Sequence, residues 1–204
     1  MELKERIVQE ASTLFFKNGI RSVTMSDVAN HLGISKRTLY EVFRDKEALL
    51  EACIIARKDQ VNKEVDQIVK DSDNVIDTMM RIYAKHLNDA HDVNKSVLHD
   101  FKKYHPQLYK RMDDGQQAER INLLLPFFQQ GVEQDLIRKD VNFEICFWLI
   151  RSQFKMLMED HQVPVDKFGT NAIVSTIILN FIRGIATPKG NELIDEMVKE
   201  INNK

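Results

Sequence analysis

Three consecutive residues, Lys36, Arg37 and Thr38, carry side chains suited to contact with nucleic acid. Lysine and arginine donate hydrogen bonds to guanine edges and to phosphates, and the methyl group of threonine suits contact with thymine. Tyr40 adds an aromatic hydroxyl two residues later. These residue types predict contact with DNA, provided that the chain presents them on an exposed element.

The neighbouring residues predict two short helices that would present this basic run. Thr24 is a good helix N-cap, and Asp27 stands three positions later, which is the spacing of a capping box. Gly33 suits the left-handed residue that ends a helix abruptly, and Ser35 is a second N-cap directly before Lys36. A helix, a glycine turn and a capped helix with a basic start are the plan of a DNA-binding helix-turn-helix.

Apolar residues at helical spacing give both predicted helices an inward face. They are Val28, Ala29 and Leu32 in the first helix and Leu39, Val42 and Phe43 in the second. A helical hairpin that belongs to a core and binds no DNA has the same pattern. The local pattern alone therefore leaves that alternative open.

A longer pattern, across residues 1 to about 58, resembles the signature of TetR-type (tetracycline-repressor-like) transcription regulators. The matching positions are Phe15, Phe16, Gly19, Thr24, Val28, Ala29, Leu32, Gly33, Ile34, Ser35, Thr38, Leu39, Tyr40, Phe43, Lys46, Glu47 and Leu49. The resemblance implies that Tyr40 and Lys46 contact phosphates and that Thr24 donates to the DNA backbone. The full predicted DNA-binding set is Thr24, Ser35, Lys36, Arg37, Thr38, Tyr40 and Lys46. Many members carry small residues at the Lys36-Arg37 positions, which puts the base preference in doubt.

The composition bounds the class of protein. Of 204 residues, 43% are hydrophobic and 29% are charged, as in ordinary globular proteins, and the net charge is -2. Any DNA binding must therefore come from a local basic face. Cys53 and Cys146 are expected to be reduced, buried thiols. The N-terminus lacks the apolar core of a signal peptide, and no apolar run approaches the roughly 20 residues that span a bilayer, so we expect a cytoplasmic protein without membrane association.

The apolar periodicity predicts an all-α protein. Helices are expected at residues 2–18, 25–32, 36–43, 46–71, 75–90, 94–104, 107–135, 143–159, 168–186 and 190–202. Asn142 is expected to cap the helix that follows it, and the helix at residues 2–18 is expected to pack across the helix-turn-helix and complete its core. Pro126 should kink or restart its helix. We expect two domains, a three-helix DNA-binding domain at residues 1–46 and a helical effector-binding and dimerisation domain at residues 47–204.

Two consecutive helices near the C-terminus are apolar around much of their circumference and must be covered on more than one side. A twofold partner would supply the second side, as in the four-helix dimer bundles of the family that this chain resembles. The alternative is that the two helices are the core of the monomer. The predicted dimer residues are Trp148, Phe154, Val174, Ile177, Ile178 and Phe181.

Methionine and aromatic residues gather in the middle of the chain, where plain core packing would explain them. The resemblance implies an effector pocket in this region, and the residue types suggest a mainly apolar small molecule. The predicted pocket residues are Met79, Tyr83, Phe101, Tyr104, Met112 and Phe127.

Other classes of function find little support. The histidines at 86, 91, 99 and 105 lack the spacing of a zinc-binding helix, so no metal or other cofactor is expected. Phosphate-binding loops and nucleophile motifs are missing, so an enzyme is not expected. A protein-interaction module would leave Lys36, Arg37, Thr38 and Tyr40 unexplained.

The sequence therefore predicts a homodimeric regulator, a repressor in most relatives, that binds a palindromic double-stranded operator under the control of a small molecule. An activator, or a regulator without an effector, is the alternative.

Overall fold

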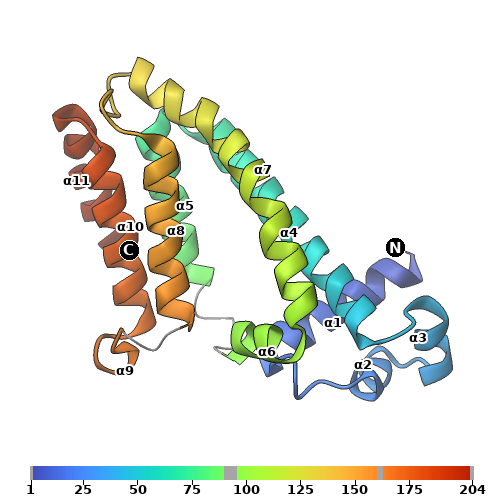
Figure 1. Ribbon diagram of the computed structural model, residues 1–204. Coiled ribbons are helices and arrows are strands. Elements are labelled where there is room, and N and C mark those ends of the chain that lie inside the picture. The colour runs from blue at the N-terminus through green and yellow to red at the C-terminus, as the bar shows by residue number, and fades with distance from the viewer. Residues whose placement is uncertain (1, 90–95, 160–162, 203–204) are drawn as a thin grey trace. The chain divides into compact units, whose positions relative to one another are not determined.

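The computed structural model describes residues 2–89, 96–159 and 163–202, and helices dominate these residues (Figure 1). The extended backbone in the described ranges contains one isolated bridge, between Ile137 and Ala186. The predicted all-α class is confirmed. His91 and the first two residues of the helix expected from residue 94 lie outside the described ranges.

Eleven helices follow one another in the described part of the chain. They are α1 (Leu3–Asn18), α2 (Met25–Leu32), α3 (Lys36–Val42), α4 (Lys46–Asp71), α5 (Val75–Asp89), α6 (Ser96–Tyr104), α7 (Pro106–Glu133), α8 (Phe143–Glu159), α9 (Val165–Phe168), α10 (Thr170–Ile185) and α11 (Pro188–Asn202).

The chain divides into two compact units. The first unit comprises Met1–Val65 and Asp92–Asp114, and the second comprises Asp66–His91 and Gly115–Lys204. Helices α4 and α7 therefore each contribute one part to either unit. The predicted domain boundary after residue 46 stays a prediction.

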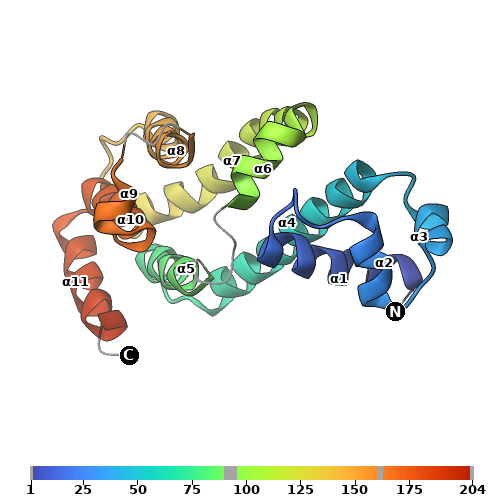
Figure 2. The same cartoon turned by 90° about the horizontal axis from the view of Figure 1, so that it is seen from below.

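The first unit has a core shared by α1, α2, α3, the start of α4, α6 and the start of α7. Its fully buried side chains include Ile7, Phe15, Val28, Leu39, Leu49 and Leu108. The prediction that α1 completes the core of the helix-turn-helix is confirmed, because two short helices cannot bury enough apolar surface alone. The view from below shows α2 and α3 together at one end of this unit (Figure 2).

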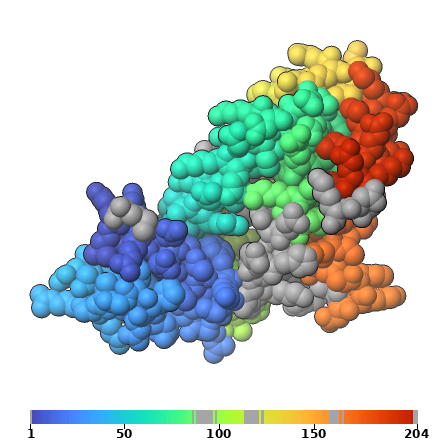
Figure 3. All heavy atoms as spheres, turned by 180° about the vertical axis from the view of Figure 1, so that it is seen from behind, coloured from blue at the N-terminus to red at the C-terminus, as the bar shows by residue number. Residues whose placement is uncertain are grey.

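The second unit contains the end of α4, α5, the later part of α7, α8, α9, α10 and α11. Its core includes Val75, Ile76, Met80, Phe128, Leu136, Ile137, Ile182, Ile185 and Ile194. Helix α11 packs on α5 and lies at the surface of this unit (Figure 3).

The helix bounds in the described ranges agree with the predicted ones to within two residues, but two features of the helices differ from the sequence prediction. The helix expected from residue 168 begins at Thr170, because Gly169 takes a φ of 80° and separates it from the short helix α9. Helix α7 continues through Pro126 as one helix, so a restart of the helix there is wrong. Asn142 caps α8 as expected, since its Oδ1 accepts a 3.1 Å bond from the Ile145 N–H.

None of the helices in the described ranges has the length and apolar character needed to cross a membrane.

Candidate nucleic-acid interface

A reciprocal capping box fixes the start of α2. The Thr24 Oγ1 accepts the Asp27 N–H at 3.2 Å, and the Asp27 carboxylate accepts the Thr24 N–H at 2.8 Å. The Thr24 hydroxyl also lies 2.7 Å from the same carboxylate oxygen. These bonds lower the pKa of Asp27, so the carboxylate is ionised at neutral pH. Both Thr24 donors are thus occupied, and a DNA phosphate would have to replace the Asp27 carboxylate.

The turn between α2 and α3 follows the sequence prediction. Gly33 takes a left-handed φ of 67°, which a residue with a Cβ adopts at a cost. Ile34 is partly buried against the core of the first unit. The Ser35 Oγ then accepts the Thr38 N–H at 3.0 Å and caps α3. Ser35 and Thr38 therefore hold the helix start, and their hydroxyls lie 2.8 Å apart.

Helix α3 presents its basic residues to solvent while its opposite face is buried. Leu39 is fully buried, and Lys36, Arg37 and Tyr40 are exposed. The Arg37 Nε donates to the Glu41 Oε1 at 3.0 Å, but the two side chains are 90% and 60% exposed. An exposed ion pair at this i, i+4 spacing typically stabilises a helix by about 0.3–0.5 kcal/mol. The Arg37 guanidinium can therefore exchange Glu41 for a base or a phosphate at little cost.

Lys46 lies at the start of α4 and is only partly exposed. Its Nζ donates to the Ile20 carbonyl at 2.5 Å and lies 5.7 Å from the centre of the Phe15 ring. Burial lowers the pKa of Lys46, and the charges of Asp100 and Asp27 oppose that effect. Lys46 therefore ties α4 to the segment between α1 and α2, and its predicted contact with a phosphate would use another of its three N–H donors.

The structure places all seven predicted DNA-binding residues in the first unit, on the α2 cap, α3 and the start of α4. Their contacts with DNA stay a prediction. Two further cations lie beside the end of α3: the Lys4 Nζ is 6.0 Å from the centre of the Phe43 ring, and the exposed Arg44 pairs with Asp45 at 3.1 Å. The sequence prediction did not include them, although the clustering of basic residues near a helix-turn-helix is the signal that would have found them.

The six predicted pocket residues are divided between the two units. Met79, Tyr83 and Phe127 belong to or pack against the core of the second unit. Phe101 and Met112 belong to or pack against the core of the first unit. Tyr104 lies on α6 of the same unit, but it is 39% exposed and belongs to neither core. The role of these residues in effector binding stays a prediction.

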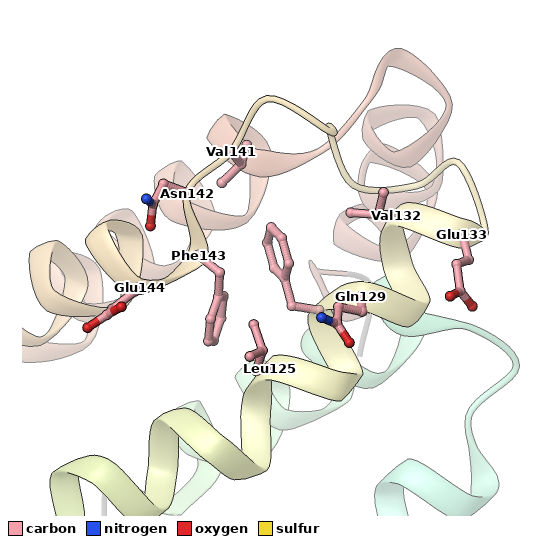
Figure 4. A pocket seen from close by; sticks show the side chains of 9 residues that line it. Leu125, Gln129, Val132, Glu133, Val141, Asn142, Phe143 and Glu144 are labelled. Atoms are coloured by element: carbon pink, nitrogen blue, oxygen red, sulfur yellow. The ribbon is translucent and has the colours of Figure 1, made fainter.

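The second unit has an open hollow of about 690 Å³ between the end of α7 and the start of α8. Apolar side chains point into it, and the rings of Phe128 and Phe143 lie 4.8 Å apart, centre to centre (Figure 4). Glu133 and Glu144 extend away from the apolar centre in the close view. The lining residues are Leu125, Phe128, Gln129, Val132, Glu133, Val141, Asn142, Phe143 and Glu144.

Helices α8 and α10, which carry the predicted dimer residues, pack against each other. On α8, Trp148 is 39% exposed and Phe154 is partly buried. On α10, Val174 and Ile177 are partly buried, and Ile178 and Phe181 pack against the core of the second unit. Ile145 at 57% and Leu149 at 58% are the more exposed apolar side chains of α8, and Met156 at 38% is exposed to about the same extent as Trp148.

The chain matches known proteins along most of its length. Residues 7–53 match the model of a family described as bacterial regulatory proteins, tetR family. The chain is 25% identical over 186 residues to the uncharacterized HTH-type transcriptional regulator YvaF of Bacillus subtilis (strain 168), which covers 90% of this chain and 95% of YvaF.

A second relative has a stated role. The chain is 23% identical over 160 residues, 78% of its length and 76% of the relative, to IcaR of Staphylococcus aureus (strain Newman), a negative transcriptional regulator of the biofilm operon icaADBC. The fold is similar to that of the ketosteroid transcriptional regulator KstR2 of Mycobacterium tuberculosis, with a TM-score of 0.57, 17% identity, and coverage of 91% of this chain and 96% of KstR2.

Proposed function

Because this chain is a transcription regulator of the TetR type, we propose that it is a homodimeric repressor that binds a palindromic operator through α3. The observation that carries the proposal is the exposed pair Lys36 and Arg37 at the start of a capped helix whose other face is buried. In a helix-turn-helix these first residues reach base edges in the major groove. Residues 1–46 then serve as the DNA-binding domain, and residues 47–204 as the domain for effector binding and dimerisation.

The repressor role rests on physical occupancy of the operator. A dimer would place two α3 helices into successive major grooves, about 34–36 Å apart, and a bound dimer would exclude polymerase from an overlapping promoter. The relative IcaR is a negative regulator, which favours repression over activation. Such a regulator acts where the DNA is, so the proposal places it in the cytoplasm.

Transcription in vitro from a promoter that overlaps the operator separates repression from activation. The proposal expects fewer transcripts as the protein is added. More transcripts at the same occupancy would support the alternative, an activator.

Dimerisation is proposed through α8 and α10. The exposed apolar side chains Ile145, Leu149 and Met156 recur on α8 at spacings of four and seven residues, which places them along one face of the helix. An exposed apolar stripe of this kind marks an interaction surface. A twofold partner would cover it together with the partly buried residues of α10.

The proposed effector is an apolar small molecule that binds in the second unit. The hollow between α7 and α8 has the volume of a small-molecule site, and its lining combines apolar side chains, including Phe128 and Phe143, with the polar Gln129 and Asn142 and the acidic Glu133 and Glu144. KstR2, which has a similar fold, is a ketosteroid regulator, and this motivates a steroid as the first probe. A long-chain fatty acid serves as a second apolar probe of a different shape. Either probe should raise the melting temperature and change the operator affinity. If neither probe changes either quantity, the alternative of a regulator without such an effector is favoured.

The test of the DNA-binding role is fluorescence anisotropy with a labelled operator obtained by selection from random DNA. Arg37→Ala should raise the operator Kd by roughly 5- to 150-fold, because a bidentate base contact is worth about 1–3 kcal/mol. The matched control is Arg57→Ala, which removes an exposed cation from α4 outside the helix-turn-helix. An equal Kd for Arg37→Ala and Arg57→Ala would overturn the assignment of α3 as the recognition helix.

A further inference from the structure

One peptide group in the first unit is held from both sides by charged side chains. The Ile20 carbonyl accepts a 2.5 Å bond from the Lys46 Nζ at the start of α4. The N–H of the same peptide group, which belongs to Arg21, donates to the Asp100 Oδ2 on α6 at 2.9 Å. The peptide group between Ile20 and Arg21 is thus clamped between α4 and α6.

The clamp is buried on the side of Asp100 and Ile20, whereas Lys46 is partly exposed. Asp100 is only 7% exposed, and Ile20 is 1% exposed. Val97 and Phe101, the neighbours of Asp100 on α6, belong to the core that also contains Ile20. A hydrogen bond to an ionised group is stronger than a neutral one, and low surrounding polarity strengthens it further. The Asp100 carboxylate would be costly to bury without this donor and the nearby Lys46 charge.

A second contact ties the same residue to α6. The Arg21 guanidinium lies 5.2 Å from the centre of the Tyr104 ring, a distance at which a cation is attracted to an aromatic face. Asp100 and Tyr104 are four residues apart on α6 and therefore lie on one face of that helix. Helix α6 thus contacts Arg21 twice, through the Asp100 carboxylate at its backbone N–H and through the Tyr104 ring at its side chain.

The clamped peptide stands just before the predicted DNA-binding surface. Arg21 precedes Thr24, the N-cap of α2, by three residues. We propose that Asp100 is a positioning residue for operator binding, which acts from α6 on the Ile20–Arg21 peptide group and thereby sets the direction in which the chain enters α2. Asp100 itself contacts no DNA. This inference rests on the proposed function, since it assigns the clamp a role in operator binding.

The consequence is that α6 and α4 control the start of α2 together. A shift of α6 against α4 must break one of the two bonds or move the peptide group that they share. Only His105 separates α6 from α7, and α7 continues into the second unit. The clamp therefore gives the chain a path along which a change at α6 alters the placement of the helix-turn-helix.

The experiment compares the full-length wild type with Asp100→Leu and Asp100→Asn. Leucine removes the acceptor, whereas asparagine keeps an acceptor oxygen but loses the charge. The matched control is Asp77→Asn in the second unit, because Asp77 is also 7% exposed and also accepts a backbone N–H, that of Asp73, at 3.0 Å. The readouts are the operator Kd and the Arg21 amide proton shift in a nitrogen–proton NMR spectrum of the free protein.

We expect Asp100→Leu to weaken operator binding by about tenfold or more and to move the Arg21 amide proton upfield. Asp100→Asn should restore a large part of the affinity and give an intermediate shift. Asp77→Asn should leave both readouts at their wild-type values. If Asp100→Leu fails to fold, the intermediate values of Asp100→Asn carry the test.

Two results would overturn the inference: wild-type operator affinity in Asp100→Leu, or an Arg21 amide shift that neither Asp100 variant changes. A failure of the proposed function is distinguishable from both. In that case the wild type itself binds no selected DNA, while the NMR shift of the free protein still reports on the clamp.

Discussion

Replacing Leu149 by alanine should weaken the proposed homodimer without disturbing the protomer. Leu149 is 58% exposed on α8, so its side chain contributes little to the core of the second unit. Ile178 is a less suitable site, because it packs against that core and its replacement would also damage the fold. A substitution at Leu149 therefore tests the role of α8 in dimerisation separately from its role in the core of the protomer.

The magnitude follows from the exposed fraction of the side chain. Full burial of a leucine is worth about 1.5–3 kcal/mol, and burial of the exposed 58% is therefore worth about 0.9–1.7 kcal/mol. A twofold interface contains two copies, which gives about 2–3.5 kcal/mol for complete loss of the contact. Alanine retains one of the four side-chain carbons, so roughly 1.5–2.5 kcal/mol is lost, or roughly 10- to 70-fold in the dimer Kd.

Sedimentation velocity across a dilution series measures this Kd. The control is Val69→Ala, which shortens a 43% exposed side chain on α4, a helix outside the proposed α8–α10 interface. Val69→Ala should sediment as the wild type does, and all three proteins should give the same circular dichroism spectrum. A wild-type dimer Kd for Leu149→Ala would refute the placement of the α8 stripe in the interface.

Two further predictions concern the second unit. Gly190→Ala should lower the melting temperature and cost about 1–3 kcal/mol in thermal unfolding, because a Cβ at Gly190 would collide with the Leu136 carbonyl oxygen. Gly184→Ala, which meets no atom within 4 Å, should instead raise the stability by about 0.5–1 kcal/mol, and equal melting temperatures for the two variants would contradict this packing. Burial raises the pKa of Asp77, but the bond from Arg81 and a backbone N–H outweigh burial and hold it below its ordinary value of 3.8. Because the pKa is lower in the folded state, the stabilisation by Asp77 is present above pH 3.8 and is lost as the pH falls through the folded value. The urea midpoint of Asp77→Ala should therefore lie below that of the wild type at pH 7, and the difference should shrink as the pH falls below 3.8, whereas a difference that does not shrink over the acid range in which the wild type stays folded would contradict the ionic role.

Local rules sufficed to predict the helix-turn-helix from the sequence. Thr24 and Asp27 are three residues apart and bond to each other, and Gly33 ends α2 by its left-handed φ. Ser35 caps α3 by accepting the N–H of the residue three positions later. Such features depend on residue type and short spacing, which a sequence displays directly. They therefore sufficed to predict that Lys36, Arg37 and Tyr40 lie on the exposed face of the second helix.

The remaining features depend on contacts between distant segments. Asp100 bonds to a backbone N–H that is 79 residues away, and the sequence contains no local sign of that partner. Apolar periodicity indicates that Phe101 and Phe127 face inward, but it does not tell which core each one enters, and the structure assigns them to different units. Gly169 separates α9 from α10 through its φ of 80°. The apolar periodicity does not show this break in the backbone, so the predicted helix began at residue 168 and included Gly169.

The central claim, that a homodimer reads DNA through two copies of α3, is tested most directly by selecting bound sequences from random DNA with the wild type and with Arg37→Ala. The account predicts a palindromic motif whose half-site centres lie about 10–10.5 base pairs, or a multiple of that, apart. It also predicts that Arg37→Ala relaxes the preference at one base pair in each half-site. A wild-type selection without a motif, or one with a single unpaired half-site, would contradict the account.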